Sequence, residues 1–448
     1  MRRAPRRLLA GLLLMLSGCA HSGYTRTAPA PAGQLPPVYL SDSDNQRPAL
    51  VVDVTEATAS STEEDAGFCK LSESDAQQIA ATRSLTGNLL ARESDAVAAQ
   101  GLQRGVNPCS VEILRSMLFA QSVMERNRSA GDALESFLLL AEAEDGLVRI
   151  KESLAEVEGM GNDLNQVRSK GLAVPVTQTE IDQQRLALQH QMEETQAASR
   201  NLNGKLAELL SMDAAETRHI WPEVDLKVDT APLEVDAEVA TALATRADLA
   251  MLEYLRSAVN PQTLPAIREA LGGLSGGLGV TLAAAVGHFA GHTDTGESDH
   301  RRGQLDELLS YRRQSVTRDV REAVAEIESS LRQVVNSREQ VKSQEQRVEN
   351  LHQQRAIGAS TTIDVRQGRL DLIRKQQQLF HDVVKWKIAV VRLREVQGQL
   401  AAEYGYGISQ EPTVAPSGDE PSDKELPDKE PAGEEVSHES LSDDDSSE

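Results

Sequence analysis

The densest group of side chains that could bind a metal lies between residues 288 and 300. His288 and His292 are four residues apart, the spacing of two zinc ligands on one helix face, and Asp294, Asp299 and His300 follow them. Glycine and threonine residues surround the group and favour a loop instead of a helix. The sequence also contains no HExxH, P-loop or dinucleotide-binding fingerprint. We therefore predict no metal site, no cofactor and no enzymatic activity.

Cys19 is the next residue whose surroundings indicate chemistry. Four arginines precede the apolar run Leu8–Leu16, whose nine residues are too few to span a bilayer. The run ends in Leu16-Ser17-Gly18-Cys19, which resembles the lipobox of bacterial lipoproteins. The resemblance implies a signal peptide over residues 1–18, a lipid on the Cys19 thiol, and, with Ala20 next, an anchor at the periplasmic face of the outer membrane. The alternative is an ordinary signal peptide with an incidental cysteine.

Export from the cytoplasm would place Cys69 and Cys109 where a disulfide can form. The spacing of the two cysteines in the sequence does not fix their distance in the fold. The sequence therefore leaves two alternatives open, a Cys69–Cys109 disulfide and two separate thiols.

The composition of the 448-residue chain excludes several classes of protein. Lys and Arg number 46 against 69 Asp and Glu, a net charge of −23, which argues against a nucleic-acid partner. Aromatic residues make up 3%, too few for the two girdles of a self-contained membrane barrel. The apolar residues are mainly alanine, leucine and valine, which favours a helical protein.

Proline-free stretches and a heptad pattern predict long helices. Between Gln304 and Ala356 one apolar line repeats every seven residues, which indicates supercoiling against a neighbouring helix. That line is Val320, Ile327, Val334, Val341 and Val348, and small or polar residues follow it three positions later at Ala323, Ser330, Ser337 and Gln344. Similar patterns predict helices over Ala76–Gln103, Val111–Val167, Thr177–Leu210, Val235–Ser257 and Ile363–Glu403. No alternating strand pattern of useful length occurs.

Two segments of the chain resemble each other. In each, a long helix ends near a glycine, Gly171 or Gly358, and a second helix begins after Thr177 or Thr361. This repeat resembles the TolC family of outer-membrane efflux ducts, in which each half ends its long helix in this way. The run Ala242-Leu243-Ala244-Thr245-Arg246-Ala247-Asp248-Leu249 resembles the run Ala-Leu-x-x-Arg-Pro-Asp-Leu between the family's halves, with Ala247 replacing proline.

The resemblance implies a homotrimer whose helices form a periplasmic tunnel working with an adaptor and an inner-membrane pump. It implies that the turns at Gly171 and Gly358 contact the adaptor. It also implies two membrane strands in each half, for which the first half has no room. The candidate in the second half is Ala270–Thr293, with Gly272, Gly276, Val280 and Leu282 as a membrane-touching element; the alternative is a loop or a short buried helix.

We accordingly predict an all-α fold of long antiparallel coiled-coil-like helices in two repeats, with little or no β structure. The predicted parts are the signal peptide 1–18, a disordered tether 19–70, helical repeats 71–230 and 231–407, and an acidic disordered tail 408–448. The predicted function is that of an outer-membrane duct lipoprotein in an export system. The alternative is a lipid-anchored periplasmic helical scaffold that has lost pore activity.

Overall fold

The computed structural model describes residues 68–104, 108–170, 176–212, 219–277 and 295–407. They belong to the first of two units into which the chain divides, residues 1–410. The helices are α1 (Glu73–Arg83), α2 (Leu85–Arg104), α3 (Pro108–Ser169), α4 (Gln178–Leu209), α5 (Val235–Thr245), α6 (Ala247–Ala258), α7 (Leu264–Gly277), α8 (Thr295–Ala356), α9 (Thr362–Val396) and α10 (Gln399–Ala402), and the strands are β1 (Cys69–Ser72) and β2 (Ile220–Glu223). The predicted all-α fold with little β structure is confirmed.

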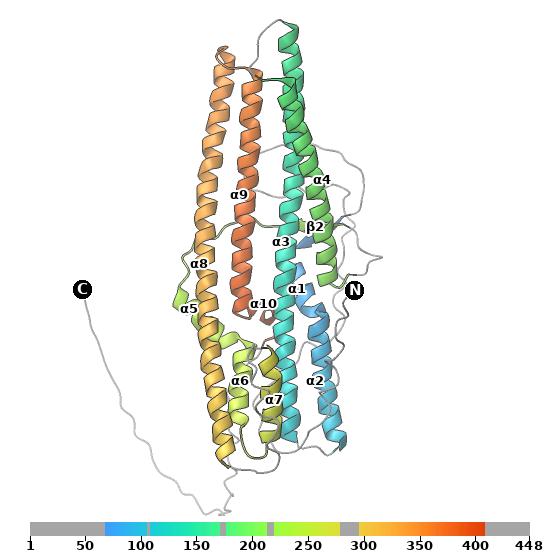
Figure 1. Ribbon diagram of the computed structural model, residues 1–448, viewed down its shortest axis with the longest axis vertical. Coiled ribbons are helices and arrows are strands. Elements are labelled where there is room, and N and C mark those ends of the chain that lie inside the picture. Colours follow the sequence, from blue (N-terminus) through green and yellow to red (C-terminus); the bar gives the residue numbers. More distant parts are fainter. Residues whose placement is uncertain (1–67, 105–107, 171–175, 213–218, 278–294, 408–448) are drawn as a thin grey trace, which may run out of the picture. The chain divides into compact units, whose positions relative to one another are not determined.

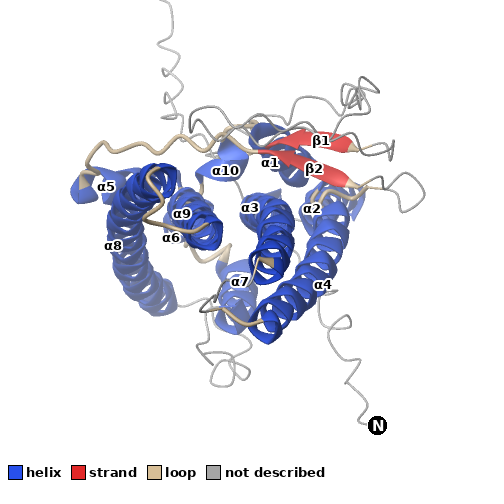
Figure 2. Ribbon diagram, turned by 90° about the horizontal axis from the view of Figure 1, so that it is seen from above, coloured by secondary structure: helices blue, strands red, loops and turns tan. Residues whose placement is uncertain are grey.

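Two long helical hairpins form the frame of this unit (Figure 1). Helices α3 and α8 have 62 residues each, which corresponds to a length of about 93 Å. Helix α4 packs on α3, α9 packs on α8, and α3 packs on α9. Seen along the helices, α4, α3, α9 and α8 follow one another in an arc (Figure 2).

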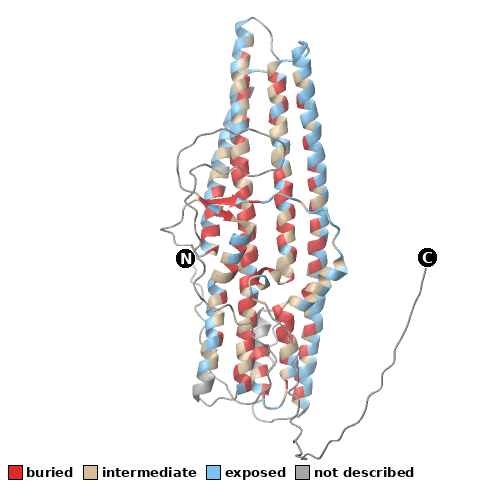
Figure 3. Cartoon of the chain, turned by 180° about the vertical axis from the view of Figure 1, so that it is seen from behind, coloured by how far each residue is buried: buried red, intermediate tan, exposed pale blue. Residues whose placement is uncertain are grey.

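Helix α8 uses the predicted heptad line to pack on α9. All five residues of the line, from Val320 to Val348, are buried. Ser330 and Ser337 of the second line are buried as well, and the small serine side chains allow the two helices to approach closely. The side chains between these lines are mostly exposed (Figure 3).

Helix α3 is the central helix of the unit. It packs against α1, α2, α4, α6, α7, α9 and α10. Adjacent residues on several of its faces are therefore buried together, among them Phe137, Leu138 and Leu140. A helix that is apolar around much of its circumference is one that has neighbours on several sides.

The two strands were not predicted from the sequence. β1 pairs in parallel with β2, with Cys69 opposite Ile220 and Leu71 opposite Pro222. Cys69 and Lys70, the last residues of the predicted tether, therefore belong to a strand. Pro222 is tolerated because a two-stranded sheet consists of edge strands, where a missing N–H leaves no ladder bond broken.

Three predicted helices are each divided in two by a short break. Ser84 separates α1 from α2, Arg246 separates α5 from α6, and Gly398 with φ +75° lies between α9 and α10. Each break redirects the chain while leaving the flanking residues helical. The structure adds α7, whose residues Ala270–Gly277 occupy the first part of the proposed membrane element.

A search of the described residues found no helix that is both long and apolar enough to cross a membrane.

Candidate functional site

The tip of the second hairpin is a tight turn between α8 and α9. Gly358 adopts φ +76°, and the N–H of Ala359 donates to the carbonyl of Gln354 at 2.8 Å. This is the hydrogen-bond pattern that ends a helix at a left-handed glycine. Ile357 beside it is 81% exposed. The prediction that Gly358 ends the long helix is thus confirmed, and the turn presents an apolar side chain to solvent.

The next helix, α9, begins in a reciprocal cap. Thr361 accepts from the Asp364 N–H at 3.2 Å, and the Asp364 carboxylate accepts from the Thr361 N–H at 2.8 Å. The hydrogen bonds that the Thr361 hydroxyl, at 2.7 Å, and the Thr361 N–H donate to the carboxylate lower the pKa of Asp364 below its ordinary value. The cap fixes the direction in which α9 leaves the turn.

The tip of the first hairpin uses the same device at the start of α4. Thr177 accepts from the Glu180 N–H at 3.3 Å, and the Glu180 carboxylate accepts from the Thr177 N–H at 2.8 Å. The hydrogen bonds with Thr177 lower the pKa of Glu180. Gly171 lies outside the described residues. The two N-caps nevertheless confirm the predicted helix starts after Thr177 and Thr361.

An ion-pair cluster joins the two hairpins near these tips. Arg366 of α9 lies 2.7 Å from Asp163 and 2.9 Å from Glu156 of α3, and Arg369 reaches Glu156 at 3.3 Å. The hydrogen bonds with Asp163 raise the pKa of Arg366 further. Gly159 makes room for the guanidinium, because a Cβ there would lie 2.2 Å from it. The cluster fixes α9 on α3 one to two turns from the tip.

A second, buried cluster lies at the break between α5 and α6. Arg246 and Arg312 both pair with Asp248, at 2.8 and 2.6 Å, and Asp248 is 6% exposed. Arg246 also donates to the carbonyl of Val396 at 2.6 Å, at the end of α9. Burial alone would raise the pKa of Asp248, but the hydrogen bonds and charges of Arg246 and Arg312 outweigh burial and lower it below its ordinary value. The arginine and aspartate of the predicted inter-half run therefore connect α6 with α8 and α9.

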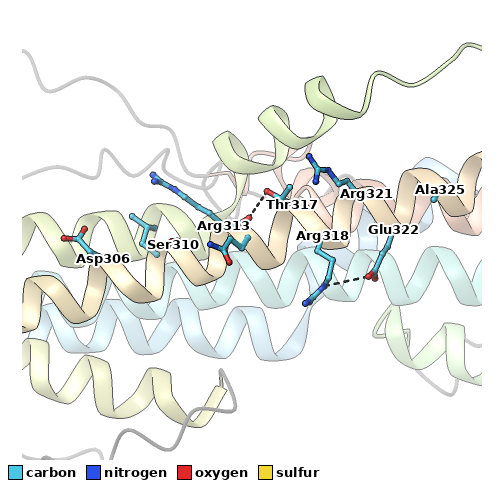
Figure 4. A pocket seen from close by; sticks show the side chains of 10 residues that line it. Asp306, Ser310, Arg313, Thr317, Arg318, Arg321, Glu322 and Ala325 are labelled. Atoms are coloured by element: carbon cyan, nitrogen blue, oxygen red, sulfur yellow. Dashed lines mark hydrogen bonds and ion pairs between the residues drawn. The ribbon is translucent and has the colours of Figure 1, made fainter.

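The outer face of α8 carries an open groove of about 730 Å³ (Figure 4). Every residue that lines it belongs to α8, between Asp306 and Ala325. Arg313 pairs with Glu253 at 2.6 Å, and Arg318 lies 3.8 Å from Glu322. The groove is thus a stretch of helix surface to which, among the described elements, α8 alone contributes.

The structure separates Cys69 from Cys109. Cys69 lies in β1, whose Leu71 packs in the same cluster as Leu134 of α3. Cys109 lies in the first turn of α3, and the 25 residues from there to Leu134 span about 37 Å of helix. Both thiols are buried and no disulfide joins them. The alternative of two separate thiols is the one observed.

The other predicted residues fall into two groups, those outside the described residues and those in α7 and α8. Cys19, Val280, Leu282, His288 and His292 lie outside the described residues, as do most of the tether and the whole acidic tail. Gly272 and Gly276 lie in the last turns of α7. Asp299 and His300 lie on the exposed side of α8, where Asp299 pairs with Arg302 at 3.2 Å.

The interhelical ion-pair clusters were not predicted from the sequence. Glu156 and Asp163 are seven residues apart, so one face of the α3 pattern carries both acids. That spacing could have indicated a partner for the face. It could not have indicated Arg366, which is 203 residues away from Asp163 along the chain.

Comparison with known proteins shows similarity of structure without similarity of sequence. No protein-family model matches the chain, and no curated protein matches it. A membrane protein from Pseudomonas aeruginosa is similar with a TM-score of 0.51 and 13% identity, over 72% of this chain and 89% of that one. The CmeC outer membrane channel of Campylobacter jejuni is similar with a TM-score of 0.51 and 12% identity, over 73% and 85%.

CusC, whose structures describe folding and transmembrane channel formation, is similar with a TM-score of 0.50 and 13% identity. This similarity covers 73% of this chain and 96% of that one. Identities this low establish the fold and not the activity. The chain therefore has the TolC-like helical fold of outer membrane channels.

Proposed function

We propose that the chain is one protomer of an outer-membrane export duct, anchored by a lipid at Cys19 on the periplasmic side. The observation that carries the proposal is the arc of four long helices with two unlike edges (Figure 2). Fold similarity to the CmeC channel agrees with it.

The two edges of the arc have surfaces that favour association. Helix α4 at one edge exposes Leu186, and α8 at the other exposes Tyr311 and Val335. Because the edges differ, copies would join head to tail, and a head-to-tail contact that repeats around an axis closes into a ring. Three copies would enclose a helical tunnel, which is the trimer that the family resemblance implies.

The tips are the proposed contact for a periplasmic adaptor and, through it, an inner-membrane pump. The turn at Gly358 is rigidly capped at Thr361 and presents the exposed apolar Ile357. A fixed turn with an exposed apolar residue is suited to a protein partner, since it loses little conformational entropy on binding. Gly171 is proposed for the same role at the first tip.

The proposed anchor rests on the sequence of the first nineteen residues. A single acyl chain binds a membrane only weakly, and stable attachment usually needs at least two membrane-binding groups. A ring of three chains would bring three lipidated cysteines to one membrane. Replacing Cys19 with serine should therefore release the protein from membranes without changing its helix content.

Planar-bilayer conductance of the purified, lipidated full chain tests the duct. We expect discrete, stable conductance steps from the natural protein. The disrupting variant is Val335→Asp, which places a charge on the α8 edge and should abolish the conductance steps. A natural protein that is silent while it folds normally and binds membranes would overturn the duct and favour the lipid-anchored scaffold.

A further inference from the structure

A second groove, of about 570 Å³, lies between α3, α4 and α9. Its apolar lining comes from all three helices: Leu139 and Ala143 of α3, Leu202 of α4 and Phe380 of α9. The volume is in the range typical of sites for small organic molecules, and the wall combines these apolar side chains with polar and charged ones.

Asp145 of α3 is the unusual member of this lining. It is 4% exposed, and its Oδ1 lies 3.5 Å from Nε of Arg149, one turn further along α3. Its Oδ2 is buried and has no hydrogen-bond partner among the described residues. Buried carboxylate oxygens nearly always have a partner, so this oxygen requires an explanation.

The charged groups around Asp145 leave it only partly neutralised. Burial raises its pKa to about 6, Arg149 opposes the rise, and Glu152 and Glu142 add to it. Above that pH the groove therefore contains a buried negative charge with one unsatisfied oxygen.

The basic side chains near the groove already contact other acids. Arg149 also pairs with Glu152 at 3.3 Å. On α9, Arg374 pairs with Asp371 at 3.1 Å, and the His381 ring contacts Glu142 at 2.7 Å. The lining residues of α4, Thr195 and Leu202, are uncharged.

We propose that this groove binds a small organic cation with an apolar body. Its ammonium group would pair with the Asp145 carboxylate, and its hydrocarbon part would pack against Leu139, Leu202 and Phe380. Charge-assisted hydrogen bonds are the strongest available to a buried carboxylate. A divalent metal is not the proposed occupant, because no group of three or more histidine, cysteine, aspartate or glutamate side chains among the described residues could hold one.

This proposal does not depend on the duct, since all of its residues belong to one chain. The test is calorimetric titration of the purified full chain with 4-phenylbutylamine, and separately with 4-phenylbutanol, which has the same body and no charge. We expect saturable binding of the amine at one molecule per chain and binding of the alcohol that is weaker by about tenfold.

Three variants locate the site. Asp145→Asn keeps the shape of the side chain and should weaken amine binding by about tenfold. Ala143→Phe fills the groove and should abolish binding of both compounds. Glu158→Gln is the matched control, because it removes an exposed acid from the same helix, and it should bind the amine as the natural protein does.

The pH dependence gives an independent readout. The amine stays protonated between about pH 8 and about pH 5, whereas Asp145 gains a proton over that range. Amine binding should weaken as the pH falls in the natural protein and stay constant in Asp145→Asn. Equal binding of amine and alcohol, or equal binding by the natural protein and Asp145→Asn at pH 8, would overturn the proposal.

Discussion

The two long hairpins share a plan but differ in how their first helix is buried. Helices α3 and α8 both have 62 residues, and in both hairpins a threonine is the N-cap of the second helix. Helix α3 has neighbours on several sides, whereas the heptad line of α8 packs mainly on α9. A repeated secondary structure therefore does not imply a repeated role: α3 is the core of the unit and α8 is one of its edges.

The largest expected losses of stability come from shortening one buried side chain in each of these two helices. Phe137→Ala in α3 should destabilise the protein by about 3–5 kcal/mol, because Phe137 is fully buried among residues of several helices. Val334→Ala in α8 should cost roughly 1.5–3 kcal/mol, since two methyl groups leave a two-helix seam. Equilibrium denaturation with urea measures both.

Equal losses of stability in these two variants would contradict the distinction between a core helix and an edge helix. The exposed control is Val335→Ala, next to Val334 on α8, which should change the unfolding free energy by less than about 0.5 kcal/mol.

Two buried acids sharpen the comparison. Asp145 of the first hairpin has an unsatisfied oxygen, while Asp382 of the second accepts from Ser337 and, at 3.0 Å, from Gln378. Asp382→Asn should therefore destabilise the fold by about 1–3 kcal/mol. Asp145→Asn should instead stabilise it at neutral pH, because it removes a buried charge.

The sign of the Asp145 effect follows from its pKa, which folding raises to about 6. Protonation thus favours the folded state, and the natural protein loses this stability as the pH rises from about 4 to about 6. The Asn variant should gain up to ~3 kcal/mol over the natural protein above about pH 6 and nothing below about pH 4. Thermal unfolding across this pH range measures the gain, and a variant less stable than the natural protein at pH 7 would contradict the account.

The smallest expected losses of stability come from removing the N-caps, and here the two hairpins should lose the same amount. Thr177→Ala and Thr361→Ala each remove the same reciprocal cap and should each cost about 1 kcal/mol. Hydrogen exchange of the first turns of α4 and α9 should rise in the corresponding variant. A loss in only one hairpin would show that the two tips are not built alike.

The features that the sequence predicts are those with a local or periodic signal. The heptad line from Val320 to Val348, the caps at Thr177 and Thr361 and the left-handed Gly358 were all identified in this way. The four-residue strands are too short to show a period, and Ser84 and Arg246 interrupt helices without proline or glycine. The sequence could not predict these breaks because distant groups satisfy the backbone there, as when Arg126 donates to the carbonyls of Ala81 and Thr82.

The groove beside Asp145 and the Arg366 cluster were beyond prediction for the same reason. Both depend on α3 and α9 lying side by side, although more than two hundred residues separate Arg366 from its partners. An acid such as Asp145 in a helical sequence is most simply read as solvated. Only the packing of α3, α4 and α9 shows that it is buried.

The most direct test of the central claim, that the chain is an open arc completed by further copies, is the native mass of the lipidated full chain in detergent. Leu186→Asp and Val335→Asp charge the two edges, and Ile357→Asp is the control because its exposed isoleucine lies in the turn at the tip, after the end of α8. We predict the mass of three chains for the natural protein and the control, and of one chain for the two edge variants. A natural protein with the mass of one chain, or edge variants that retain the mass of three, would contradict the account.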